Sequence, residues 1–234
     1  MTAHDFLQLQ AVDSALDALA NRRPRLPELA VHDRDKSAVA AVESAMAVAQ
    51  ARVDAAQKAI EAAEHAANDL TAKRVRLEAQ LKTVIAPREA EALMNQIATI
   101  NGQRGELDDQ ELAALDEQAA AEAEIAVLGQ QLPALHAALE VSGTMLTEAV
   151  ATLDAEAATL HAERVGLVAT MAAGDLATYA HARKQFHGVG VAHLEGSHCS
   201  GCHMDLSPAE LDLVKSSPVG ALSECPQCGR ILVR

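Results

Sequence analysis

The chain has 234 residues, and half of them are apolar, but only two are Phe, one is Tyr and none is Trp. Globular cores draw much of their buried area from aromatic side chains, so this composition argues against an ordinary globule of this length. An apolar fraction made mostly of alanine, with Glu, Leu and Arg, is instead typical of long helices or coiled coils. The formal net charge of −14 makes the chain as a whole a poor binder of phosphate backbones.

The negative charge is unevenly placed along the chain. Residues 183–234 carry five basic and five acidic side chains, so the whole surplus of −14 lies on residues 1–182. An acidic helical region repels nucleic acid, whereas the neutral C-terminal region leaves nucleic-acid binding open.

The sequence also predicts a compartment. Met1 to Asp5 lack the basic start and apolar run of a secretory signal. No run of eighteen apolar residues is present, and the cysteines follow a zinc pattern that suits a reducing compartment. We therefore expect a cytoplasmic protein without a membrane segment.

A short first helix is predicted over residues 3–20, ending where Pro24 and Pro27 interrupt it. A much longer one is predicted from Asp33 to Val84, because apolar or small side chains recur there in steps of three and four. The members of this row are Val39, Val42, Met46, Ala49, Val53, Ala56, Ile60, Ala63, Ala67, Leu70, Arg74, Leu77, Leu81 and Val84. Such persistence over several heptads predicts a coiled coil.

Pro87 interrupts this pattern and is followed by acidic residues, as at the start of a new helix. We therefore expect the chain to reverse at residues 85–88. The returning helix is predicted to run to about Met171. Its apolar row includes Leu93, Ile97, Ile100, Leu107, Leu112, Leu115 and Ile125, with a change of phase near Leu112, and then Leu132, Leu139, Leu146, Leu153, Leu160 and Leu167.

The leucines at intervals of seven suggest a DNA-binding zipper, but the preceding segment 108–124 is acidic, which excludes that interpretation. Two long helices joined by a short connection favour an antiparallel hairpin within one chain over a dimer of chains. A monomer and a dimer both remain compatible with the pattern.

After the hairpin, Asp175 to Gln185 is predicted to form a short helix capped by Asp175. A second short helix is predicted to start with Ser207 as its cap and Pro208 at its first position. Between these two helices the chain reaches its first pair of cysteines.

All four cysteines occur in two Cys-x-x-Cys pairs, Cys199 with Cys202 and Cys225 with Cys228. Two thiolates at this spacing bind one metal ion, and two such turns form a tetrahedral four-sulfur site. Gly201, Gly229 and Pro226 suit tight, partly left-handed turns.

A redox or structural disulfide is the competing interpretation of one Cys-x-x-Cys pair. Two pairs at zinc-ribbon separation, without any alternation of strands and helices, favour one Zn²⁺ bound by Cys199, Cys202, Cys225 and Cys228. Because the four thiolates leave no open coordination position, the metal is expected to be structural. Distinguishing zinc from iron requires metal analysis.

The predicted fold is mainly α: a long antiparallel coiled-coil hairpin over residues 1–174, with its tip near 85–88, followed by a short helix and a small four-cysteine zinc ribbon over 175–234. The chain resembles the bacterial C4-type zinc-ribbon proteins with an N-terminal coiled-coil hairpin. The resemblance rests on segments 199–206 and 225–233, and more weakly on 9–13, on Leu26-Pro27, and on Asp175 to Tyr179 with Arg183.

This resemblance implies a helical hairpin with a ribbon at its base. Chlamydial and Helicobacter members are linked to the alternative sigma factor sigma-54, to flagellar or type III secretion assembly and, in one case, to messenger RNA. The Ala and Arg usage suggests an actinobacterial member, in which those particular partners do not carry over.

The sequence is compatible with three classes of function to different degrees. The first is a non-enzymatic adaptor or chaperone that docks protein partners through the coiled-coil arm and the ribbon, in transcription or secretion-related assemblies. The alternative is RNA or DNA binding through the ribbon, by Arg183, Lys184, Lys215, Arg230 and Arg234, although stacking aromatic side chains are nearly absent. An enzyme is disfavoured because the sequence contains no recognisable catalytic set.

Five histidines surround the first cysteine pair at intervals of five or six residues: His181, His187, His193, His198 and His203. A second metal site is one interpretation of this spacing. We favour partly exposed surface histidines, with His198 and His203 as neighbours of the metal ligands.

Overall fold

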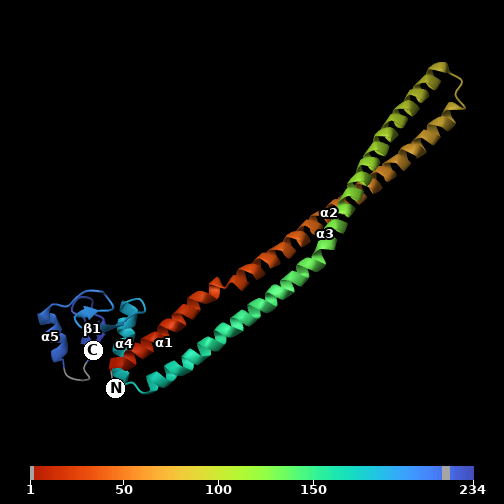
Figure 1. Ribbon diagram of the computed structural model, residues 1–234. Coiled ribbons are helices and arrows are strands. Elements are labelled where there is room, and N and C mark those ends of the chain that lie inside the picture. Colours follow the sequence, from red (N-terminus) through yellow and green to blue (C-terminus); the bar gives the residue numbers. More distant parts are fainter. Residues whose placement is uncertain (1–2, 218–221) are drawn as a thin grey trace. The chain divides into compact units, whose positions relative to one another are not determined.

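The computed structural model describes residues 3–217 and 222–234. Met1 and Thr2, at the start of the predicted hairpin, and residues 218–221, within the predicted ribbon, lie outside this range. The helices are α1 Ala3–Arg22, α2 Pro27–Leu81, α3 Pro87–Ala169, α4 Ala173–Gln185 and α5 Pro208–Ser216, with a 3₁₀ turn at Arg23–Arg25 (Figure 1). The strands are β1 Val191–Glu195, β2 His198–Cys199, β3 Ser223–Glu224 and β4 Ile231–Val233.

Contacts divide the chain into two compact units, which we describe separately. The hairpin unit is His32–Ser142, and the ribbon unit combines Met1–Val31 with Gly143–Arg234. The division predicted at residues 174 and 175 stays a prediction.

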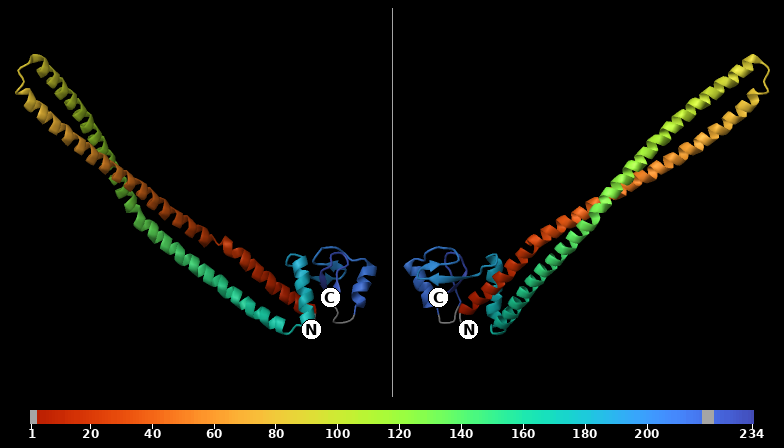
Figure 2. Two further views of the ribbon diagram at one scale, coloured as in Figure 1. Left: turned by 180° about the vertical axis from the view of Figure 1, so that it is seen from behind. Right: turned by 45° about the vertical axis from the view of Figure 1, so that its right-hand side comes forward.

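Within the hairpin unit, α2 and α3 lie side by side and antiparallel, as both views in Figure 2 show. Arg52 of α2 forms ion pairs with Glu117 and Glu124 of α3 at 2.7 and 2.5 Å. Every member of the apolar row predicted for α2 is buried or half-buried. The mainly helical fold with an intramolecular hairpin is therefore confirmed.

The start of α2 differs from the prediction. The helix begins at Pro27, six residues before Asp33, because proline fits the first turn of a helix, where no amide donor is needed. Leu26, directly before it, is extended with ψ of 129°, the conformation that a following proline favours.

The predicted phase of α3 is wrong at two positions. Leu112 and Leu115 were expected in the apolar row but are exposed, whereas Glu111, Ala114 and Gln118 are half-buried. The phase is set by flanking residues: Leu107, half-buried, and Ala121, buried, continue the steps of three and four on either side.

In the ribbon unit the strands form one sheet in the order β2-β1-β4-β3. β1 and β4 are parallel, with Val191 opposite Ile231, and the two outer pairings are antiparallel. β2 pairs only with the end of β1, Ser200 bonds with His193, and Gln10 of α1 satisfies the edge at Val191. Its side-chain amide donates to the carbonyl of Val191 at 2.9 Å and accepts from the Val191 amide at 2.6 Å.

The two faces of this sheet form two hydrophobic clusters. One face presents Val191, Ile231 and Val233 to a cluster that also holds Phe6 and Leu9 of α1, Met171, and Tyr179 and Ala182 of α4. The opposite face presents Ala192 and Leu232 to a cluster with Cys199, Leu206, Val214 and Cys225. Strand alternation therefore places α1 and α4 on one side of the sheet, and the cysteines with α5 on the other.

A buried carboxylate connects three helices of the ribbon unit. Asp13 of α1, 5% exposed, accepts from Arg164 of α3 at 2.7 Å and from the hydroxyl of Tyr179 of α4 at 2.8 Å. Arg183 donates to the Asp13 carbonyl at 3.2 Å and to the Asp17 carboxylate at 2.5 Å. Burial raises the pKa of Tyr179, and the hydrogen bond to Asp13 raises it further.

The predicted helix cap is confirmed for α5 but not for α4. Ser207 and Glu210 form the reciprocal capping box at the start of α5, with Pro208 in the first turn, as predicted. The predicted cap of α4 is wrong: Ala172 occupies that position without a side-chain bond, and Asp175 lies in the first turn. Asp175 there suits the positive end of the helix dipole.

Candidate metal centre

The two Cys-x-x-Cys turns have the same backbone hydrogen bonds. In the first, the amide of His203 donates to the Cys199 carbonyl at 2.8 Å and that of Cys199 donates to the Met204 carbonyl at 3.0 Å. In the second, Gly229 donates to Cys225 at 2.7 Å and Cys225 to Arg230 at 2.8 Å. The two Cys-x-x-Cys segments therefore form equivalent turns, and the two thiols of each turn point in the same direction.

The residue that follows the second cysteine of each turn is left-handed. Gly229 has φ of +76°, which glycine adopts freely, and His203 has φ of +59°, which is uncommon for residues with a side chain. Sequence reasoning missed this role of His203. Aligning the two turns would have revealed it, because His203 stands where the second turn has glycine.

Gly201 serves a different purpose from the predicted one. It has no positive φ, but a Cβ at this position would lie 2.7 Å from Cδ of Arg230 and 2.8 Å from Cβ of Ala192. Glycine is therefore required there by close approach. Arg230 also donates to the carbonyl of Val189 at 2.8 Å and stacks on Phe186, with Cζ 4.8 Å from the ring centroid.

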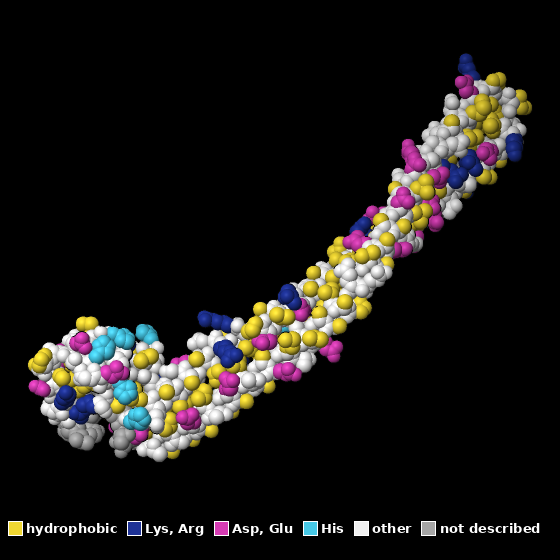
Figure 3. Space-filling view, viewed as in Figure 1, with side chains coloured by type: hydrophobic (Ala, Val, Ile, Leu, Met, Phe, Trp, Pro, Cys, Tyr) yellow, Lys and Arg dark blue, Asp and Glu magenta, His cyan; other side chains and the backbone are white. Residues whose placement is uncertain are grey.

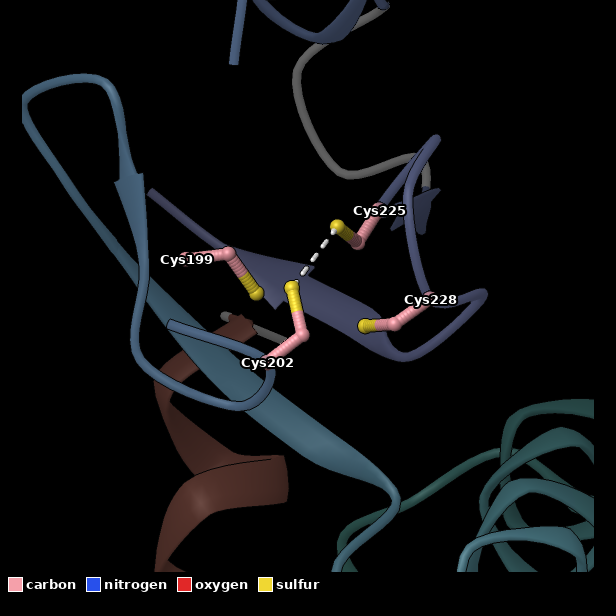
Figure 4. A group of neighbouring side chains, drawn as sticks. All are labelled: Cys199, Cys202, Cys225 and Cys228. Carbon is pink, nitrogen blue, oxygen red and sulfur yellow. Dashed lines mark hydrogen bonds between the residues drawn. The ribbon is translucent and has the colours of Figure 1, made fainter. Parts of the chain in front are cut away.

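The four thiols converge. Figure 4 shows the Sγ atoms of Cys199, Cys202, Cys225 and Cys228 pointing toward one another from two loops. All four lie within 4.8 Å of one another, and those of Cys202 and Cys225 are 3.9 Å apart. Zn–S bonds of about 2.3 Å in a tetrahedron place sulfurs about 3.8 Å apart, so the donor set fits zinc. All four cysteines are free thiols, which excludes a disulfide in this structure.

The thiols differ in their surroundings. Burial raises the pKa of Cys225 to about 12 and also raises the pKa of Cys202. Burial acts in the same direction on Cys228, but hydrogen bonds from the Arg230 amide and side chain outweigh it and lower its pKa. Arg230 is thus the positive group placed to offset thiolate charge, as in sites where neighbouring donors orient and stabilise the ligands.

The histidines do not join this group. Within the part of the chain that the structure describes, the four cysteines are the only His, Cys, Asp or Glu cluster with metal-binding geometry. The rings of His198 and His203 are 5.8 Å apart, and Nδ1 of His198 lies 3.3 Å from Oδ1 of Asp205. His181, His187 and His193 are exposed.

Most cations proposed for phosphate contacts have partners inside the ribbon unit. Arg183 and Arg230 make the contacts given above. Arg234 donates to the carbonyls of Lys215 and Ser217, at 2.9 and 3.3 Å, and so caps the end of α5. Lys184 remains an exposed side chain.

Two family models match the chain. The CT398-like coiled coil hairpin domain matches residues 9–187, and the C4-type zinc ribbon domain matches residues 198–232. The four clustered cysteines and the ribbon match are together consistent with one structural zinc, as predicted.

The chain is similar to known proteins over nearly its whole length. The "Uncharacterized protein Rv2229c" of Mycobacterium tuberculosis is 24% identical, over 97% of this chain and 93% of that protein. CT398 from Chlamydia trachomatis has a similar solved structure, with a TM-score of 0.85, 20% identity and coverage of 99% and 96%. The solved structure of the HP0958 protein from Helicobacter pylori has a TM-score of 0.66 and 15% identity, and the match covers 98% of this chain and 95% of that one.

These likenesses confirm the resemblance inferred from the cysteine motifs, including relatives in actinobacteria. At such identities the solved structures establish the fold alone. Among the described helices, none has an apolar stretch long enough to cross a membrane.

Proposed function

The chain belongs to the family of CT398-like coiled coil hairpin domains, and from that premise we propose that it is a non-enzymatic adaptor or chaperone. It docks protein partners through the hairpin unit and acts in the cytoplasm, in transcription or secretion-related assemblies. The ribbon keeps its own unit folded around one zinc ion.

The exposure of apolar side chains on the hairpin unit carries this proposal. Among the described residues of His32–Ser142, three large apolar side chains are buried, namely Val39, Ile60 and Ile100. Eight are exposed: Val48, Val75, Ile85, Met94, Leu112, Leu115, Val127 and Val141. Figure 3 shows apolar side chains spread along the visible surface of the hairpin. Adjoining exposed apolar side chains are typical of protein interaction sites, and Leu112 and Leu115, three positions apart on α3, are such neighbours.

The proposed role of zinc is structural. We assign Cys199, Cys202, Cys225 and Cys228 as its ligands, because their thiols converge from two equivalent turns. Four protein ligands complete a tetrahedron and leave no position for a substrate, so a catalytic role is disfavoured. Zinc bound there holds the two turns together beneath the sheet.

Nucleic-acid binding through the ribbon is the weaker candidate. Three of its five cations, Arg183, Arg230 and Arg234, make intramolecular contacts that phosphate binding would have to share or break. The aromatic ring beside them, Phe186, is covered by Arg230. Among the residues of the ribbon unit that the structure describes, neither a free basic groove nor a stacking platform supports this function.

Photocrosslinking in the native host tests the proposal. A benzophenone amino acid replaces Val127 of the hairpin unit, and a matched variant carries it at Leu213 of the ribbon unit, where exposure is similar at 58% and 66%. We expect a discrete protein adduct from position 127 that resists nuclease. Nuclease-sensitive adducts from position 213, with RNA binding by the pure protein that persists at physiological salt, would overturn the proposal.

A further inference from the structure

The outward face of α3 carries two leucines that helix packing does not use. Leu112 is 60% exposed and Leu115 is 43% exposed. Residues three positions apart on a helix are surface neighbours, so these side chains form one apolar patch. Ala119, also exposed, extends the patch by one turn.

The packing between α2 and α3 makes this exposure notable. At the same level of α3, the half-buried positions facing α2 hold Glu111 and Gln118. These two polar residues, with Ala114 between them, occupy the packed row while leucines face water, the reverse of the usual helix pattern. A partner that covers the leucines accounts for this arrangement, because the hairpin alone gains nothing from it.

The charges around the leucines indicate the chemistry of that partner. From Gly105 through Ser142 the sequence contains no Lys or Arg and nine acidic residues: Glu106, Asp108, Asp109, Glu111, Asp116, Glu117, Glu122, Glu124 and Glu140. Asp108 and Asp116 lie one helical turn before and after Leu112.

Several of these carboxylates lack a partner. Glu117 and Glu124 pair with Arg52, and Glu122 accepts from Gln118. Glu106, Asp108, Asp109 and Asp116, by contrast, make no hydrogen bond or ion pair with any residue that the structure describes. Three of these unpaired carboxylates, Asp108, Asp109 and Asp116, lie on the same side of α3 as the leucines and remain available to a cationic partner.

We propose that the acidic leucine face, formed by Asp108, Asp109, Leu112, Leu115 and Asp116, docks a basic amphipathic helix of a partner protein. Apolar side chains of that helix cover the two leucines, and its Lys and Arg residues pair with the surrounding carboxylates. This inference rests on the proposed function, since it names the partner chemistry of the same hairpin. Face-to-face pairing with a second copy is disfavoured, because it would set carboxylates against carboxylates.

A synthetic peptide probes this face on the full-length, zinc-loaded protein. The peptide is a labelled helix with leucines on one stripe and lysines on both flanks, and its control has the same composition in a scrambled order without the stripe. Fluorescence anisotropy at physiological salt should show binding of the first peptide and much weaker binding of the second. Equal binding of both would overturn the proposal, since charge attraction alone would explain it.

Three variants separate the apolar and charged contributions. The double variant Leu112→Gln and Leu115→Gln should weaken peptide binding roughly tenfold or more, because the leucines of the peptide lose the apolar side chains on which they pack. Val127→Gln is the matched control, because Val127 lies on the same helix and is 58% exposed. It lies in segment 125–139, which carries no Asp or Glu, so this variant should leave peptide binding unchanged. Asp108→Asn with Asp116→Asn should weaken binding and reduce its salt dependence. Equal losses for the leucine variant and Val127→Gln would overturn the proposal.

Two further results distinguish this inference from the proposed function. If the leucine variant abolishes self-association of the pure protein in sedimentation, the occupant is a second copy and the inference fails. If a protein adduct forms from position 127 in the host and the leucine variant leaves it intact, the adaptor function stands and this face is not its docking site.

Discussion

The ribbon unit and the hairpin unit are stabilised in different ways. The ribbon unit has two hydrophobic clusters, a four-thiol site and a buried carboxylate that binds three helices. The hairpin unit has a thin row of contacts in which Ala49, Ala56, Ala63 and Ala121 are prominent, and eight of its large apolar side chains are exposed. Dense internal contacts leave little surface for partners, whereas a thin two-helix layer leaves much. The difference suggests that the ribbon unit is built for stability and the hairpin unit for recognition.

The largest effect should follow loss of a thiol. Cys202→Ser removes one ligand and should abolish zinc binding, because structural zinc sites supply about 10 kcal/mol or more to folding. We expect hydrogen exchange to lose protection over 191–233 and over α1, since Phe6 and Leu9 pack on the same sheet. Protection of residues 40–75 should persist. Ser200→Ala, in the same turn, is the control and should retain the metal.

Removing the buried carboxylate should be the next largest change. Asp13→Ala leaves Arg164 and Tyr179 without their shared acceptor and should destabilise the ribbon unit by about 3–5 kcal/mol. Asp17→Asn, at a carboxylate 58% exposed, should cost less than about 1 kcal/mol. Hydrogen exchange measured at increasing denaturant concentration gives the free energy of unfolding of the ribbon unit for both variants. Similar effects for the two variants would show that Asp13 is not the central acceptor.

The two cysteine turns should respond in opposite directions to matched substitutions. Gly229→Ala forces a side chain into a left-handed backbone and should cost about 1–2 kcal/mol. His203→Gly relieves the equivalent strain and should leave stability unchanged or raise it by a fraction of that amount. Zinc retention against a competing chelator measures both. A strong loss of zinc in His203→Gly would instead assign the imidazole a direct role at the metal.

The smallest effect concerns the packed row of the hairpin unit. Glu111→Leu places an apolar side chain at a half-buried position and should raise its stability by about 1 kcal/mol. Glu106→Leu adds the same side chain at an exposed position and should change stability by less than about 0.5 kcal/mol. Thermal unfolding monitored by circular dichroism provides the comparison. Destabilisation by Glu111→Leu would indicate that Leu112 and Leu115 occupy the row instead.

Local patterns were sufficient to predict much of this structure. Steps of three and four fixed which residues of α2 face α3, and Cys-x-x-Cys spacing fixed which side chains converge. Both patterns repeat within a few residues, so a single helix or turn determines them. Ser207 and Pro208 likewise form a cap whose partners are only three residues away.

The missed features depend on residues distant in sequence. Asp13 is buried only because Arg164 and Tyr179 reach it from two other helices. Leu112 and Leu115 continue an apolar pattern, but the row that packs runs from Leu107 to Ala121 without them, and only the structure shows which row faces inward. From the sequence, Arg230 is expected to be a cation available to phosphate, and only the fold brings Val189 and Phe186 into contact with it.

The amide of Gln10 that completes the edge of β1 also sets an order of events during synthesis. Gln10 and Val191 are 181 positions apart, so at about 5–20 residues per second roughly 10–40 s separate their appearance on the ribosome. The helices of the hairpin unit have their partners much earlier. α1 therefore emerges with Phe6 and Leu9 uncovered, since the other buried residues of their cluster begin at Met171 and end at Val233. For that interval the nascent chain offers chaperones an apolar helix that the finished molecule conceals.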